Sequence, residues 1–228
     1  MPPLSHSRRA NGSSRRPGNG KSNGRPPEGP RFVLYVEGPR DQSLLAAWAH
    51  RMSPRLGRSL DAVTVILGGR RPARAAEHFR ALCVTHTTAR GLCVLDRDAD
   101  DAPRPPPVVE PGLEFFTWGR RHIESYLLVP GAIRRSLKLP ATDARVERFF
   151  RSELPASEEE LGAVDAKPLF ASRGEFERLL GRAVRPIHVA RAMHAGEIHA
   201  DVLDVLARVR GGLGLGDARA QLRAKRDA

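Results

Sequence analysis

Carboxylates follow two apolar runs of this sequence, at the points where strands would end. Glu37 comes directly after the run at residues 31–36, and Asp96 and Asp98 stand at the end of the run at residues 91–96. In an open parallel sheet the carboxyl ends of the strands meet at one edge, where ligands bind. Carboxylates gathered there repel one another, and their hard oxygen atoms suit Mg²⁺ or Mn²⁺. These residues therefore predict a site for one or two such ions.

Two further features stand near the same edge. Asp41 comes one short loop later, and two interpretations stay open for it: a further metal ligand, or the N-cap of a helix that begins at Gln42. Gly68 and Gly69 end the apolar run at residues 62–67. Without side chains, the backbone at these glycines can approach either a phosphate or a neighbouring strand.

The elements that must position these residues alternate between two patterns. The short apolar runs at residues 31–36, 62–67 and 91–96 are typical of strands that helices cover on both faces. Between them, residues 41–52 and 71–86 carry apolar side chains at helical spacing. The order strand, helix, strand, helix, strand predicts an α/β fold with right-handed crossovers.

The rest of the chain divides by composition. Residues 99–112 are a proline-rich loop, and residues 113–118 are expected to form a fourth strand. We expect a central, mostly parallel four-stranded sheet flanked by helices, with a C-terminal helical extension. The expected segments are a disordered basic tail at 1–30, the α/β core at 31–130, the helical extension packed on the core at 131–210, and a flexible tail at 211–228.

The charge of the chain indicates a polyanionic partner. The formal net charge is +12, and the segment at residues 1–30 contains several arginines against a single acidic residue. Such an excess favours binding of nucleic acid. Arginine, alanine, glycine and proline are all abundant, so a coding bias is an alternative source of part of the excess.

Cysteine usage and hydropathy bear on the compartment. Cys83 and Cys93 lie in apolar runs, which favours buried free thiols in a reducing cytoplasm over a disulfide. No apolar run reaches about 18 residues, and the N-terminal residues lack the apolar segment of a secretory signal. We therefore expect a cytoplasmic protein with no membrane partner.

The motifs at the expected strand ends resemble a known family. The succession "VEGPRD", "ILGG" and "LDRDAD" is similar to the TOPRIM domain shared by topoisomerases, primases and small nucleases. The continuation "RRHIESYLLVPGAI", with the later "VDAKPLFASRGEFERLL" and "VARAMHAGEI", resembles the TOPRIM module of the overcoming-lysogenization-defect (OLD) nucleases. The resemblance covers roughly residues 31–210 and implies a metal-dependent endonuclease, acting on DNA or RNA in phage defence.

The resemblance also implies roles for individual residues. Glu37 matches the TOPRIM glutamate, which is a metal ligand or a general acid or base. Asp41 matches the acidic residue that follows this glutamate in OLD-type modules, and Asp96 and Asp98 match the metal-binding Asp-x-Asp pair. The histidines, His122 among them, show no spacing typical of ligands, and no role is assigned to them.

Two later residues complete the expected site. Glu124 matches the glutamate of the Ile-Glu-x-Tyr-Leu element, a further metal ligand; the apolar residues around it favour a buried, paired role over a surface charge. Lys167 matches a lysine that lies near the scissile phosphate in OLD-type enzymes. The alternative for Lys167 is a solvated lysine in a loop. Arg97 and Arg121 could contact phosphate or form ordinary ion pairs.

The absence of a phosphate loop bears on partners. OLD proteins carry an ATPase in the same chain, but this sequence lacks a GxxxxGK[ST] motif that follows a strand. The resemblance then implies a standalone form that acts with a separate ATPase partner. A non-catalytic or partner-inhibited nucleic-acid-binding effector and a small RNA-processing TOPRIM enzyme stay open as alternatives, as does a homodimer.

Overall fold

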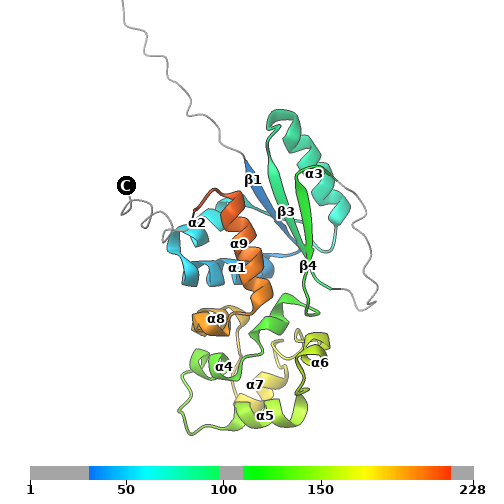
Figure 1. Ribbon diagram of the computed structural model, residues 1–228. Coiled ribbons are helices and arrows are strands. Elements are labelled where there is room, and N and C mark those ends of the chain that lie inside the picture. Colours follow the sequence, from blue (N-terminus) through cyan, green and yellow to red (C-terminus); the bar gives the residue numbers. More distant parts are fainter. Residues whose placement is uncertain (1–30, 98–109, 217–228) are drawn as a thin grey trace, which may run out of the picture.

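Four parallel strands form the centre of the fold (Figure 1). The computed structural model describes residues 31–97 and 110–216. The strands are β1 (Phe32–Val36), β2 (Thr64–Ile66), β3 (Arg90–Leu95) and β4 (Leu113–Thr117), and their order in the sheet is β2-β1-β3-β4. The expected four-stranded α/β fold is therefore confirmed, and the sheet is parallel throughout.

Strand β1 lies inside the sheet and pairs on both sides. Leu34 is in register with Thr64 of β2 on one side and with Leu92 of β3 on the other. The chain leaves β1 toward β2 and then crosses back to β3, so the direction of winding reverses between β1 and β3. Such a reversal opens a crevice at the carboxyl ends of the two strands, where open α/β sheets bind ligands.

Two layers of helices bury the two faces of the sheet. Helices α1 (Pro39–Met52), α2 (Pro54–Val63) and α9 (Ala200–Gly212) cover one face, and α3 (Pro72–Thr85) covers the other (Figure 1). Alternate residues of β1 point to opposite layers, because Leu34 and Val36 belong to the first apolar cluster while Val33 and Tyr35 belong to the second. This burial on both faces explains why the strand sequences are continuously apolar.

The helical extension lies beyond the carboxyl ends of the strands (Figure 1). As observed, it differs from the expected range 131–210, because α9 packs on the sheet and η1 precedes that range. Its elements are the 3₁₀ turn η1 (Ile123–Leu127), α4 (Pro130–Ser136), α5 (Arg145–Glu153), α6 (Glu158–Ala163), α7 (Glu175–Leu180), α8 (Pro186–Ala192) and the 3₁₀ turn η2 (Ala195–Glu197). Its interior contains the rings of Phe149, Phe170 and Phe176. The centroid of the Phe176 ring lies 5.2 Å from that of Phe149 and 5.0 Å from that of Phe170. These rings belong to the same apolar cluster as Leu34, so the extension shares one core with the sheet.

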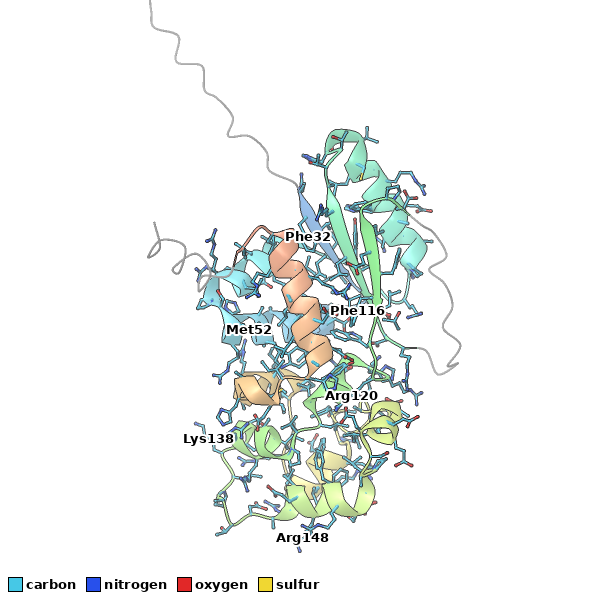
Figure 2. All side chains as sticks on the ribbon, viewed as in Figure 1. Phe32, Met52, Phe116, Arg120, Lys138 and Arg148 are labelled. Carbon is cyan, nitrogen blue, oxygen red and sulfur yellow. The ribbon has the colours of Figure 1, made fainter. Side chains whose placement is uncertain are left out.

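The observed elements differ in three places from those expected from the sequence. Helix α2 was not expected; Ser53 caps it by accepting a hydrogen bond from the Leu56 N–H (3.4 Å), and Pro54 starts it. The helix takes in the first residues of the predicted second strand, which shortens β2. Met52, placed on the buried face by its spacing, is 41 % exposed at the end of α1 (Figure 2).

Several expectations concern residues outside the described ranges. The tail at 1–30, the part of the C-terminal tail at 217–228 and most of the proline-rich loop lie there. Helix α9 extends to Gly212, into the segment expected as a tail. Within residues 31–97 and 110–216, every helix is too short or too polar to cross a membrane. Cys93 is buried as expected, Cys83 is half-buried, and both thiols are free.

Candidate functional site

Glu37 and Asp96 meet where the winding of the sheet reverses. Each residue directly follows the last residue of its strand, and the two strands are neighbours. The backbone N–H of Asp96 donates a hydrogen bond of 2.9 Å to Oε1 of Glu37. Burial raises the pKa of Glu37, and the charge of Asp96 raises it further, while this hydrogen bond and nearby cations act in the opposite direction.

The paired glycines fix the backbone of Glu37. The N–H groups of Gly68 and Gly69 donate to the carbonyl oxygen of Glu37, at 3.0 and 2.8 Å. Both glycines have positive φ angles, +77° and +110°, which a residue with a side chain rarely adopts. The backbone of the two glycines therefore approaches the end of the neighbouring strand β1, which is one of the two interpretations of this motif.

Asp41 lies inside the first turn of α1. The helix begins at Pro39, so the expected start at Gln42 is wrong, and Asp41 is not the N-cap. Its Oδ2 atom accepts a hydrogen bond of 2.7 Å from the N–H of Gly38 and so satisfies the residue before the helix. Burial raises the pKa of Asp41 to about 7, and the charges of other carboxylates at the site add to this shift.

Asp96 receives three donors from residues that follow β4 in the chain. Its Oδ2 lies 2.9 Å from Nζ of Lys167 and 3.2 Å from Nδ1 of His122, and its Oδ1 accepts from the N–H of Ile123 at 3.3 Å. Burial acts to lower the pKa of Lys167, but the hydrogen bond and charge of Asp96 outweigh it and raise that pKa. Lys167 is therefore paired with the carboxylate, although its side chain stays 44 % exposed in its turn.

Glu124 is almost fully buried, at 2 % exposure, in the turn η1. Its Oε1 accepts a hydrogen bond of 2.9 Å from the guanidinium of Arg40, in the first turn of α1. Its Oε2 is buried without a hydrogen-bond partner among the described atoms. The buried, paired interpretation of Glu124 agrees with this position, and the surface-charge alternative does not. A buried carboxylate oxygen without a partner is costly and is explained by strain or by a bound water or ion. Oε2 of Glu147, in α5, is in the same condition away from the sheet edge.

The structure adds His122 and Asp165, to which the sequence assigned no role. Nδ1 of His122 faces Asp96, and its Nε2 lies 3.3 Å from Oδ1 of Asp165. The same Asp165 oxygen accepts a hydrogen bond of 3.1 Å from the backbone N–H of Lys167. His122 therefore bridges the sheet edge and the loop that carries the lysine. The available signal was position: His122 lies inside the stretch "RRHIESYLLVPGAI" and Asp165 inside "VDAKPLFASRGEFERLL".

Arginines complete the surroundings of the carboxylates. NH1 of Arg70 lies 3.9 Å from Oε1 of Glu37 and donates to the backbone carbonyl of Asp96. Of the two arginines with open roles, Arg97 donates to the carbonyl of Gly119 (2.8 Å), and Arg121 lies 3.8 Å from Asp165. Arg121 thus has the weaker, more exposed kind of ion pair.

The carboxylate oxygens at the site are of the type that binds a divalent cation, but their side chains are not arranged around one point. Glu37, Asp41, Asp96 and Glu124 supply carboxylate oxygens of the type that Mg²⁺ prefers, including the unsatisfied Oε2 of Glu124. Among the described residues, however, no group of three or more His, Cys, Asp or Glu side chains is arranged to hold a metal ion. Strand β3 ends at Leu95, and the remaining predicted ligand, Asp98, lies outside the described ranges.

Comparisons of this chain with protein-family models, with curated proteins and with solved structures each found no match. The resemblance to the TOPRIM module of OLD nucleases therefore stays a prediction from the motifs. A proposal about function therefore depends on these motifs and on the contacts of the carboxylates at the edge of the sheet.

Proposed function

We propose that this chain is a TOPRIM-type module of the OLD class that hydrolyses phosphodiester bonds of DNA or RNA with Mg²⁺ or Mn²⁺. One observation carries the proposal: Glu37, Asp41, Asp96 and Glu124 converge with Lys167 at the winding reversal of the sheet. The charges of the other three carboxylates each act to raise the pKa of Asp41. A group of carboxylates that destabilise one another in this way is relieved by a divalent cation.

The carboxylates have a binding role in this proposal. Glu37, Asp96 and Glu124 are the ligands that the site would offer, with Asp41 from the first turn of α1 and Asp98 from the segment after β3. When bound, Mg²⁺ or Mn²⁺ supplies charge neutralisation and polarisation of the phosphate. Gly68 and Gly69 hold the Glu37 backbone, so this residue is positioned before any ligand arrives.

Lys167 has a role in charge stabilisation. Its side chain is 44 % exposed, and its ion-pair partner among the described residues is Asp96, so the ammonium group can turn from the carboxylate to a phosphate oxygen. There it offsets the negative charge that develops as the phosphodiester reacts. The compact ammonium suits this position better than the planar guanidinium used elsewhere in the chain.

A second function is favoured by a different observation. The ion pairs of Lys167 with Asp96 and of Arg40 with Glu124 occupy oxygen atoms that a cation would otherwise use. A non-catalytic or partner-inhibited effector would keep these pairs. In that case a separate ATPase, in a cytoplasmic phage-defence system, would control the module.

Cleavage assays separate the two functions. We expect the full chain to nick plasmid DNA or cut structured RNA with Mg²⁺ or Mn²⁺, and the Asp96→Asn variant to lose this activity. Asp204→Asn, on the exposed side of α9, is the matched control and keeps it. Equal cleavage by wild type and Asp96→Asn contradicts the nuclease proposal. Binding of nucleic acid without cleavage by any variant favours the effector.

A further inference from the structure

A groove runs between α1 and α8 and ends beside the carboxylate site. It consists of two hollows of about 440 and 260 Å³, and both are lined by Ser43 of α1 and Ile187 of α8. Because they share these two walls, the hollows are neighbours along α1. We call them together the α1–α8 groove. The smaller hollow is lined by Arg40, whose guanidinium binds Glu124, so the groove leads to the site.

The charge on the rim of the groove is mostly positive. Arg51 and Arg191 line the larger hollow, and both side chains are exposed. Neither has an ion-pair partner among the described residues. His50 adds a further nitrogen donor, and Asp61 is the one carboxylate that lines either hollow. Unpaired guanidinium groups beside a hollow are suited to phosphate oxygens.

The floor of the groove is apolar and held in place. Ala46 and Ala47 line it with small side chains, which leave room for a sugar or a base. Beneath them, the indole N–H of Trp48 donates to the sulfur of Met193 at 3.2 Å and joins α1 to the chain after α8. The His50 ring packs so closely on Gly57 of α2 that a Cβ there would overlap it. The groove is thus a preformed surface.

We infer that the α1–α8 groove binds the backbone of a single nucleic-acid strand and leads it to the carboxylate site; the inference rests on the proposed nuclease function. Arg40 and Arg51 stand about 16 Å apart along α1, at about 1.5 Å per residue. That length spans about five nucleotides of a stacked strand. A duplex is convex and would touch only the rim, whereas a single strand can place sugars and bases on the apolar floor.

Binding measured without metal tests this inference apart from catalysis. The full chain is titrated in EDTA with fluorescent dT12, U12 and a 12-base-pair duplex, over a series of salt concentrations. The variant is Arg51→Ala/Arg191→Ala. The control is Arg148→Ala/Arg151→Ala, which removes the same charge from α5, at the far end of the helical extension (Figure 2). The basic segment at residues 1–30 is present in the wild type and in both variants, so its contribution to binding is the same in all three.

The expected result is specific to the groove. Loss of two phosphate contacts lowers the salt slope for a single strand by about 1.4 and weakens binding at moderate salt by on the order of tenfold. The control keeps the wild-type slope. Whichever of dT12 and U12 shows the loss identifies the sugar that the groove accepts. Equal slopes for the two double variants, or a loss seen with the duplex alone, overturn the inference.

Failure of the groove inference can be told apart from failure of the nuclease proposal. If the groove variant binds a single strand more weakly and no protein cleaves, the groove stands and the nuclease proposal fails. If the groove variant cleaves and binds as the wild type does, the nuclease proposal stands and the groove fails. Circular dichroism melts of both double variants check that each is folded.

Discussion

Nζ of Lys167 lies 2.9 Å from Oδ2 of Asp96, although 71 positions of the sequence separate the two residues. The lysine comes from a loop of the helical extension and the aspartate from the end of a central strand. Their contact joins the two parts of the molecule at the winding reversal of the sheet.

Lys167→Ala should reduce cleavage with little loss of stability. The ammonium group offsets charge in the reacting phosphodiester, and loss of one such group costs about 10²–10³ in kcat. Lys167→Arg restores only part of the activity, because a guanidinium differs in shape and hydration. Lys138→Ala is the control, since Lys138 is exposed and lies in the helical extension away from the site (Figure 2). Equal kcat for Lys167→Ala and Lys138→Ala contradicts the role.

Asp41 should make stability fall as pH rises. The pKa of Asp41 in the folded chain is about 7, above its value in the unfolded chain. The neutral carboxyl is therefore favoured by folding: its contribution is complete below about pH 4 and is lost as pH rises through 7. The loss is at most on the order of 4 kcal/mol. Asp41→Asn keeps an acceptor for the Gly38 N–H but cannot ionise.

Urea unfolding of wild type and Asp41→Asn, at intervals from pH 5 to pH 8, measures this effect. The variant should gain stability relative to wild type across that range. Parallel curves for the two proteins would mean that Asp41 ionises freely in the folded chain.

A divalent cation should stabilise the protein more at high pH than at low pH. Ionised carboxylates bind the ion, and binding to the folded state raises the free energy of unfolding. For about 1 kcal/mol of stabilisation, the melting temperature of a chain of this size rises by about 2–4 °C. Thermal melts with Mn²⁺, Mg²⁺ or EDTA at pH 5.5 and 8 provide the test. An Asp96→Asn/Glu124→Gln variant that shifts as much as wild type would place the ion elsewhere.

Loss of Arg40 should leave a buried charge without a partner. Glu124 is 2 % exposed and forms its ion pair with Arg40, so Arg40→Ala should lower the free energy of unfolding by about 1–3 kcal/mol. The value is modest because the Arg40 side chain is 57 % exposed. Adding Glu124→Gln should recover part of the loss, which a double-mutant cycle measures. Additive effects of the two changes would show that the pair contributes nothing.

The two glycines at the end of α9 should respond oppositely to alanine. A Cβ on Gly212 would overlap the ring of Phe32, whereas a Cβ on Gly211 meets no atom within 4 Å. Gly212→Ala should destabilise by about 1–3 kcal/mol through overpacking. Gly211→Ala should stabilise by about 0.5–1 kcal/mol, since alanine favours a helix. Chemical denaturation compares them, and similar changes for both would mean that α9 does not pack on β1 as described.

The sheet and the meeting of Glu37 with Asp96 were predictable from the sequence. Continuous apolar runs identify buried strands, and a parallel sheet brings their carboxyl ends to one edge whatever the details of packing. The assignment of Lys167 and Glu124 to the site came from the resemblance alone, because no local sequence pattern places either residue at that edge. Their positions depend on how the helical extension folds back.

The remaining features arise from contacts that sequence spacing does not contain. His122 and Asp165 are linked to Asp96 through space, and a search for ligands at short spacing cannot find them. The capping role of Asp41 depends on whether α1 begins at Pro39 or later, and helix boundaries are the least certain part of a sequence pattern. Helix α2 was not predicted, because the apolar residues at its C-terminal end are equally compatible with the start of a strand.

The contact of Gly212 with Phe32 bears on how the chain folds during its synthesis. Phe32 opens the first described strand, and Gly212 ends the last described helix. On the ribosome, β1 emerges early but cannot complete its side of the core until α9 has also left the exit tunnel. Until then the end of β1 at Phe32 lacks the cover of α9, although α1 and α2 can already pack on the same face of the sheet, and a nascent chain halted before residue 200 would keep this part of the core open.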